Sequence, residues 1–198
     1  MNNYYLEGEE RFGRVSSRLY AFFSGLPEMR SFYAYVINDL EASGAKRILD
    51  IGSGTGSIML GLEAKRPGLA LYAVEPSREM LGIARRRSHG LVHFAQGSSR
   101  HVPFRGRFDM IFSTLSFHHW KRQRESLGYL AGLLADSGEI RIYEVDKGRA
   151  GFFLRLAAGS HSVSADGIRR TIPGALRLSS YSNFGRFARI VMKRRRLH

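Results

Sequence analysis

The sequence predicts an α/β protein in which crossover helices connect the strands of a mostly parallel sheet. Short apolar and β-branched runs alternate with longer segments of helical character along residues 46–145. A glycine-rich turn follows the first of these runs. Near the C-terminus, two strand-like runs stand too close together for a parallel crossover, so they must form an antiparallel hairpin.

The expected elements follow in alternating order. Two aromatic-rich helices come first, at 9–24 and 28–43, and Pro27 after Gly25 separates them. Strands of the parallel part are expected at 46–51, 69–75, 90–96, 107–113 and 138–145. Helices between them are expected at 55–65, 76–87 and 120–135. After these come helical pieces at 149–159 and 164–171 and hairpin strands at 175–182 and 186–193. The whole is a Rossmann-like doubly wound sheet of five parallel strands plus a C-terminal antiparallel hairpin, with two N-terminal helices.

Composition limits the classes of protein that the chain can belong to. Its 198 residues suit a single domain with a sizeable core. The absence of cysteine excludes a disulfide scaffold, a thiol nucleophile and cysteine-based metal sites, and we expect no metal. The polar start MNNYYLEGEER is unlike a signal peptide, and the longest apolar stretches are too short to span a bilayer. We therefore expect a soluble cytoplasmic protein.

The charge balance is strongly positive, because 31 basic residues face 17 acids for a net +14. Of the basic residues, 26 are Arg and 5 are Lys. The segment between Glu79 and Asp109 holds several arginines and no acid, and the tail KRRRLH adds more. Such a surface suits nucleic acid or an acidic substrate, whereas a solvated helix face and an exposed terminus explain the same residues. Aromatic residues are not interleaved with the arginines, so no base-stacking platform is visible.

The sharpest local feature is ILDIGSGTG at residues 48–56, where a strand runs through three glycines into a helix. Glycines permit a tight turn and a close approach of the backbone to a ligand. Ligands of open α/β sheets bind at this edge. Glu75 stands at the end of the next strand, 19 residues after Gly56, where its carboxylate can accept hydrogen bonds from a ribose diol. These features together predict a nucleoside-containing cofactor.

The residues in and after the glycine loop distinguish it from the dinucleotide-binding fingerprint and from the P-loop. A dinucleotide fingerprint would place a third glycine at position 57, where the chain has Ser57. No Lys follows the loop, as a P-loop requires. A nicotinamide dehydrogenase is therefore disfavoured, and the terminal hairpin also opposes it.

ILDIGSGTG resembles the first motif of the class I S-adenosylmethionine-dependent methyltransferases. Four later segments resemble the family's other motifs in order: AVEPSREML (73–81), GSSRHVPF (97–104), FDMIFSTLSFHHW (108–120) and LADSGEIRIYEVD (134–146). The terminal hairpin also fits that fold. The subgroup that the chain resembles is the small-molecule methyltransferases similar to ubiquinone and menaquinone biosynthesis enzymes.

The resemblance implies S-adenosylmethionine as cofactor and assigns roles to residues. Asp50, Gly52, Ser53, Gly54 and Gly56 would wrap the methionine and ribose part. Glu75 would bind the ribose hydroxyls, and Pro76 would lie near the adenine. Ser98 and Ser99 would sit at the adenine edge, although the family often has Asp at position 98. Ser113 and Thr114 would close the pocket, and Tyr20 would lie at the cofactor's edge. Within one domain, residues 1–45 would form a helical cap, 46–146 the cofactor-binding core and 147–198 the C-terminal helices and hairpin.

Methyl transfer needs a base only when the acceptor must lose a proton, so catalytic residues are harder to recognise than cofactor residues. His118 and His119 follow the fourth strand near the expected methyl group, and His can titrate near neutral pH. Adjacent side chains tend to point apart, so at most one should face the pocket, and His118 is the predicted base.

Three function hypotheses remain open. The first is a methyltransferase acting on a small organic molecule. It is favoured because the fourth strand is followed by LSFHHW rather than an Asp-Pro-Pro-Tyr-like motif, which disfavours amino methylation and favours an O- or C-acceptor. The second is an RNA- or ribosome-directed methyltransferase that uses the basic surface. The third is a non-catalytic binding protein on the same fold. The oligomeric state is left open.

Overall fold

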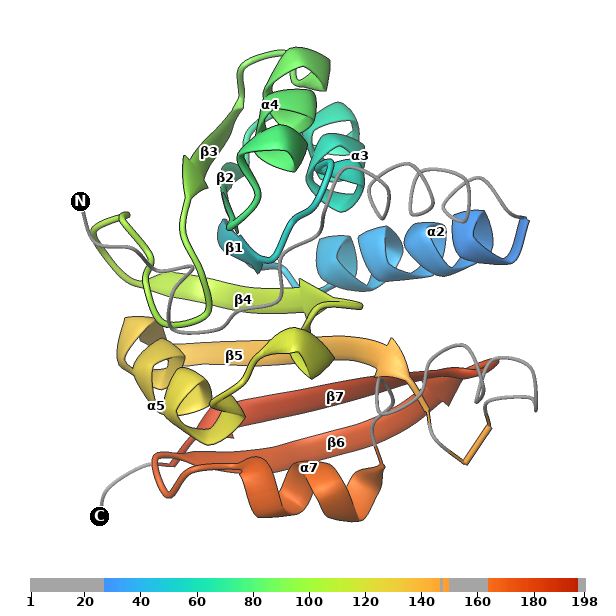
Figure 1. The fold of residues 1–198 in the computed structure, drawn as a ribbon, viewed down its shortest axis with the longest axis vertical. Helices are drawn as coiled ribbons and strands as arrows, with labels where there is room; N and C mark the ends of the chain where they lie inside the picture. Colours follow the sequence, from blue (N-terminus) through green and yellow to red (C-terminus); the bar gives the residue numbers. More distant parts are fainter. Residues whose placement is uncertain (1–26, 147, 150–163, 196–198) are drawn as a thin grey trace.

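The computed structural model describes residues 27–146, 148–149 and 164–195. Seven strands form one sheet in the order β3-β2-β1-β4-β5-β7-β6. Pairs among the first five strands are parallel, whereas β7 is antiparallel to both β5 and β6 (Figure 1). The strands are β1 (Arg47–Ile51), β2 (Ala70–Glu75), β3 (Val92–Gln96), β4 (Phe108–Thr114), β5 (Leu134–Val145), β6 (Leu176–Phe184) and β7 (Phe187–Arg194). The predicted five parallel strands with a terminal antiparallel hairpin are confirmed.

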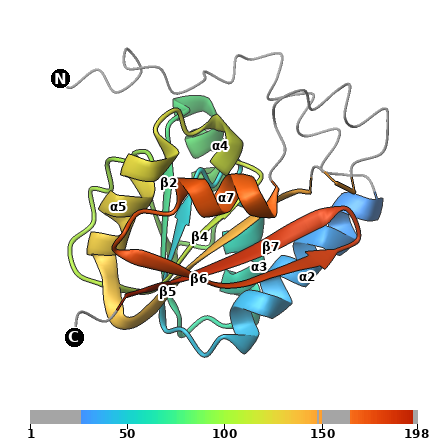
Figure 2. The ribbon, with the colours of Figure 1, turned by 90° about the horizontal axis from the view of Figure 1, so that it is seen from below.

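Helices cover both faces of this sheet. Figure 2 shows α5 and α7 on one side and α2 and α3 on the other. Core residues of α2, α3 and α4 form one apolar cluster, and those of α5 and α7 belong to a second cluster. The helices are α2 (Pro27–Ala42), α3 (Ser57–Lys65), α4 (Arg78–Arg87), α5 (Gln123–Leu133) and α7 (Ala165–Thr171), with a short 3₁₀ turn η1 (Phe117–His119). None of the described helices is long and apolar enough to cross a membrane.

Several element boundaries differ from the prediction for identifiable reasons. The helix expected at 55–65 begins at Ser57, because Gly56 takes a left-handed conformation as its N-cap. The helix expected at 76–87 begins at Arg78, because the Ser77 hydroxyl caps it by accepting from the Met80 N–H at 3.3 Å. β5 begins at Leu134 instead of 138, because Leu134 already pairs with Phe108 before a register shift. The predicted helices at 9–24 and 149–159 lie outside the described residues, apart from Arg149 in the second.

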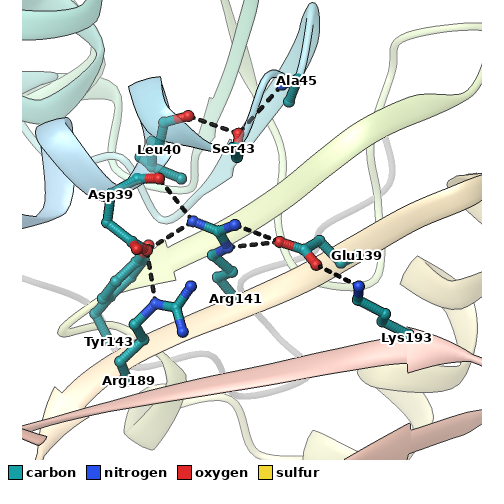
Figure 3. Close-up of polar contacts among 9 residues, drawn as sticks. All are labelled: Asp39, Leu40, Ser43, Ala45, Glu139, Arg141, Tyr143, Arg189 and Lys193. Carbon is teal, nitrogen blue, oxygen red and sulfur yellow. Dashed lines mark hydrogen bonds and ion pairs between the residues drawn. The ribbon is translucent and has the colours of Figure 1, made fainter. Parts of the chain in front are cut away.

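A charged network fastens α2 to the sheet. The carboxylate oxygen Asp39 Oδ2 accepts hydrogen bonds from Arg141 Nη1 at 2.7 Å, Arg189 Nε at 2.7 Å and Tyr143 Oη at 2.5 Å. Arg141 also contacts Glu139, which pairs with Lys193 (Figure 3). The Arg141 side chain is only 8% exposed, so its charge depends on these carboxylates. The network therefore positions the helix that precedes the glycine loop.

A buried carboxylate, that of Glu63, holds the turn between α4 and β3. Glu63 is 3% exposed and accepts from the Ser88 hydroxyl at 2.9 Å and from the N–H groups of His89 and Leu91 at 3.2 and 2.9 Å. Burial by itself raises the pKa of Glu63, but the hydrogen bonds from Leu91, Ser88 and His89 outweigh it and leave the pKa lowered.

Glu63→Ala is expected to lower the free energy of unfolding by about 2 kcal/mol, because buried N–H groups lose their acceptor. Since the folded-state pKa is lowered, the stabilisation is present above the ordinary pKa of about 4.3 and is lost as the pH falls through the folded value. Urea unfolding at neutral and acid pH measures both effects. A cost that is the same at both pH values would contradict the assignment to the ionised carboxylate.

Candidate functional site

A cavity opens at the carboxyl ends of β1, β2 and β4. Including its open mouth, it encloses about 610 Å³ of space. Its lining comes from the glycine loop, the start of α4, the turn after β3 and the segment after β4: Ile51, Gly52, Gly54, Glu75, Pro76, Met80, Ser98, Ser99, Thr114, Leu115, Ser116, His119 and Trp120. The cavity thus lies at the edge where ligands of open α/β sheets bind.

Two glycines of the loop lie so close to neighbouring side chains that a Cβ at either position would clash. Gly52 has φ +75°, and a Cβ placed there would lie 2.0 Å from the hydroxyl oxygen of Ser116. Gly56 has φ +79°, and its Cβ would meet the Phe94 ring at 3.0 Å. The N–H groups of Gly52 and Ser53 donate to the Val74 carbonyl at 2.9 and 3.1 Å, which ties the loop to β2. Glycine is therefore required here by both conformation and space.

The Glu75 carboxylate joins the end of β2 to this loop. Its Oε2 accepts from the Gly54 N–H at 2.8 Å, and its Oε1 accepts from the Ser77 N–H at 2.9 Å. Glu75 is 4% exposed and lines the cavity. Each carboxylate oxygen can accept more than one hydrogen bond, so a diol in the cavity can still be bound. The carboxylate thus points toward the glycine loop, as its predicted role requires.

Four buried side-chain oxygens at the ends of β1 and β4 have no hydrogen-bond partner within the described part of the chain. They are Asp50 Oδ1, Ser53 Oγ, Ser113 Oγ and Thr114 Oγ1. Buried polar groups are normally paired, and unpaired ones indicate a missing ligand or water. All four belong to residues predicted to contact the cofactor. Their chemistry fits a polar ligand with amino and carboxylate groups.

Burial also changes the ionisation of Asp50. Desolvation is the main reason why the pKa of Asp50 lies well above its ordinary value, and the negative charge of Glu75 adds to it. Ionised Asp50 therefore costs stability in the ligand-free protein, whereas a cationic amino group in the cavity would favour the ionised form.

Asp50→Asn is therefore expected to raise the free energy of unfolding at neutral pH by about 1 kcal/mol and to weaken S-adenosylmethionine binding by about tenfold. The folded-state pKa is raised, so the gain is largest above that pKa and disappears below the ordinary value of about 3.9. Thermal unfolding with and without ligand measures both quantities. A variant that is less stable than the wild type would contradict this account of Asp50.

The chain is similar in sequence to known methyltransferases. Residues 49–142 match a family described as "Methyltransferase domain". Over this stretch the chain is similar to methyltransferases. It is 32% identical over 114 residues to an uncharacterized methyltransferase of Staphylococcus carnosus, covering 57% of this chain and 53% of that protein. It is 34% identical over 103 residues to the demethylmenaquinone methyltransferase of Thermus thermophilus, covering 50% of this chain and 47% of that protein.

A solved structure agrees with the fold of this chain. Human N-acetylserotonin methyltransferase, in complex with S-adenosylmethionine, superposes with a TM-score of 0.66 at 15% identity over 82% of this chain and 51% of that one. The chain spans about half the length of the curated relatives that it matches.

The predicted adenine-edge residues Ser98 and Ser99 line the cavity in a compact turn. The backbone N–H of Ser98 donates to the His101 carbonyl at 2.8 Å, and its hydroxyl accepts from the Arg100 N–H at 3.2 Å. The Ser99 hydroxyl lies 2.9 Å from that of Ser126 on α5. Pro76 also lines the cavity. Tyr20, predicted at the cofactor's edge, lies outside the described residues.

The two predicted histidines take different positions. His119 lines the cavity, whereas His118 does not contribute to the lining and instead contacts Glu144 on β5. Leu115, between β4 and η1, has φ +51°, which is rare for a residue other than glycine and turns the chain sharply over the cavity. The sequence did not single out Glu144 or the cavity residues Ile51, Met80, Leu115, Ser116 and Trp120. Glu144 offered one signal, since a carboxylate stands among apolar residues in YEV, near the end of a buried strand.

Many of the arginines form hydrogen bonds that stabilise the fold. Eight of them in the described part donate to backbone carbonyl oxygens: Arg47, Arg85, Arg87, Arg107, Arg124, Arg141, Arg194 and Arg195. Arg107, for example, contacts the carbonyls of Gly132 and Leu134 at the end of α5. Carbonyl contacts stabilise helix and strand ends without neutralising charge. The positive balance therefore does not by itself indicate nucleic acid.

The described residues contain no group of three or more His, Asp or Glu side chains arranged to hold a metal ion.

Proposed function

We propose that this protein transfers a methyl group from S-adenosylmethionine to a small organic acceptor. The observation that carries the proposal is the cavity in which Glu75 is fixed to the glycine loop and in which Thr114, whose buried hydroxyl has no partner among the described residues, forms part of the lining. The family match supports the cofactor. When bound, the cofactor supplies an activated methyl group on a sulfonium, so the protein's own task is to bind, orient and exclude water.

Each part of the cavity has a role in this proposal. Glu75 accepts hydrogen bonds from the ribose hydroxyls, because it is the carboxylate at the end of β2. Pro76, Ser98 and Ser99 bound the end of the cavity that takes the adenine. Asp50 and Ser53 bind the amino and carboxylate groups of the methionine part, and Ser113 and Thr114 close the cavity at the end of β4. Gly52, Gly54 and Gly56 let the backbone approach the ligand.

A small acceptor is supported over RNA by three observations. The segment after β4 reads LSFHHW, which lacks the Asp-Pro-Pro-Tyr-like pattern of amino methylation and favours an O- or C-acceptor. Three arginines from the acid-free segment, Arg85, Arg87 and Arg107, contact backbone carbonyls. The relative from Thermus thermophilus is named for a small-molecule acceptor, demethylmenaquinone. We further propose the single-domain arrangement predicted above, with residues 1–45 as a cap over the acceptor.

Isothermal titration calorimetry with S-adenosylmethionine and S-adenosylhomocysteine tests the proposal. We expect both to bind with micromolar dissociation constants, whereas NAD does not bind. Absence of binding at millimolar ligand would refute it. Binding to bulk RNA with a steep dependence on salt would instead favour the RNA-directed alternative.

A further inference from the structure

A basic cleft lies at the end of the sheet opposite the cofactor cavity. It is formed by the starts of β5 and β6 and the end of β7, away from the arrowheads of β4 and β5 in Figure 1. Including its open mouth, it encloses about 1220 Å³. Four basic side chains and a single carboxylate line it: Arg177, Lys193, Arg194, Arg195 and Asp136. It shares no lining residue with the cofactor cavity, and the length of β5 separates the two by roughly 20 Å.

Arg177 has the least compensated charge in this cleft. Its side chain is exposed, and none of the described residues forms a hydrogen bond or ion pair with it. Its register partner across the hairpin is Lys193. Directly opposed residues of an antiparallel pair share one face, and like charges in such positions destabilise the pair. The hairpin therefore carries a repulsion that a bound anion would relieve.

The carboxylates near the cleft are already shared among other cations. Glu139 contacts Arg141 as well as Lys193, the latter at 3.5 Å (Figure 3). Asp136 is fully exposed and lies 3.7 Å from Arg194, and exposed pairs of this kind contribute little. Positive charge is thus left over at the bottom of the hairpin.

Hydrogen bonds to carbonyl oxygens hold two of the arginines in the wall of the cleft. Arg195 Nε donates to the Leu176 carbonyl at 3.2 Å, and Arg194 Nη1 donates to the Leu134 carbonyl at 3.4 Å. A carbonyl oxygen does not neutralise a guanidinium, and each guanidinium has five N–H donors, so donors remain for a ligand. Side chains that are already held lose less conformational freedom when a ligand binds.

The spacing of the backbone suits a compact anion better than an extended chain. Neighbouring strands lie about 4.8 Å apart and successive residues of a strand about 3.3 Å. Arg177, Lys193 and Arg195 therefore extend from backbone positions within about 8 Å of one another, a footprint that linked phosphate groups can cover. The other lining residues are Ser137 and Gly138, so the described lining offers no aromatic ring on which a base could stack.

We propose that this cleft binds a compact polyphosphate anion, such as the triphosphate group of a nucleotide, with Arg177 and Lys193 as its principal partners. Phosphate oxygens accept charge-assisted hydrogen bonds from both groups, and the planar guanidinium can bind two oxygens at once. The nucleoside part is not contacted, so inorganic tripolyphosphate and ATP should bind alike. The inference is independent of the proposed methyl transfer, because the cleft and the cofactor cavity are separate.

Calorimetry of the full chain with inorganic tripolyphosphate, in metal-free buffer at low salt, tests the site. The wild type is compared with Arg177→Gln and Arg177→Lys, each with and without S-adenosylhomocysteine. Arg30→Gln is the matched control, because Arg30 is an exposed arginine near the start of α2 that does not line the cleft.

We expect the wild type to bind tripolyphosphate with a micromolar dissociation constant, and Arg177→Gln to weaken binding by at least about tenfold. Arg177→Lys, which keeps the charge, recovers part of this loss, and Arg30→Gln changes the affinity by less than about twofold. S-adenosylhomocysteine leaves the affinity unchanged. Without ligand, Arg177→Gln raises Tm by about 1–3 °C, because the repulsion across the hairpin is removed. A merely structural role for Arg177 would lower Tm instead.

No binding at millimolar tripolyphosphate, or equal losses in Arg177→Gln and Arg30→Gln, would overturn the site. Competition by S-adenosylhomocysteine would place the anion in the cofactor cavity and would also overturn it. Binding of poly(U) through Arg177 without binding of tripolyphosphate would show that the cleft takes an extended phosphate backbone, and the compact ligand would be wrong. Failure of the wild type to bind S-adenosylhomocysteine would refute the proposed function alone, so the two failures are distinguishable.

Discussion

Replacing Glu75 with alanine is expected to lower the affinity for S-adenosylmethionine by at least about 100-fold. In the proposed complex, two hydrogen bonds from the ribose hydroxyls to a carboxylate are lost, and bonds to a charged group contribute about 1.5–3 kcal/mol each. A factor of ten in affinity corresponds to about 1.4 kcal/mol. The variant also frees the N–H groups of Gly54 and Ser77, so the glycine loop loses its tie to the end of β2.

Calorimetry with S-adenosylmethionine measures this loss, and Glu125→Ala is the matched control. It removes the same charge from a side chain that is 63% exposed and that pairs across the surface with Arg122. We expect no change in affinity for the control. A loss of less than about threefold in Glu75→Ala would show that this carboxylate does not bind the cofactor.

Asp39→Asn is expected to lower the free energy of unfolding by about 3 kcal/mol. The substitution leaves Arg141 and Arg189 without the carboxylate that receives their hydrogen bonds, and removing one partner of a buried ion pair is strongly destabilising. We place the cost at the lower end of the usual range because the Asp39 side chain is 20% exposed. The loss loosens α2 from β5 and β7, as the contacts in Figure 3 indicate.

The pH dependence of this effect has a definite sign. Burial alone raises the pKa of Asp39, but hydrogen bonds from Arg189 and Tyr143 and the charges of Arg141 and Arg189 outweigh it and leave the pKa lowered. The stabilisation is therefore present above the ordinary pKa of about 3.9 and is lost as the pH falls through the folded value. Urea unfolding of the wild type and the variant should converge at acid pH.

Glu41→Gln is the matched control for Asp39. It removes a negative charge from the same helix, but its partner Lys65 is 47% exposed, and exposed pairs contribute little. We expect a change of less than about 1 kcal/mol. A cost for Asp39→Asn no larger than that of this control would contradict a structural role for the network.

Local patterns were sufficient to predict the fold and the centre of the site. Apolar runs alternate with helical segments, and the short gap between the last two strands admits only an antiparallel pair. The glycine spacing and the acid at the end of the following strand predicted the loop and Glu75, because adjacent parallel strands end at the same edge. These inferences depend on residues close together in the chain, so periodicity and turn chemistry are enough to make them.

Only the tertiary structure decided which polar side chains meet across the sheet. His118 contacts Glu144 across 26 positions of the chain, and Asp39 meets Arg189 across 150. Ser116 lies against Gly52 because the turn at Leu115 folds the segment after β4 back over the loop. Periodicity along the chain says which face a residue occupies, but a hydrogen bond also needs the register and packing of separate elements. For that reason the fold and the cofactor loop follow from the sequence, whereas the partners of His118 and of the arginines follow from the packed sheet.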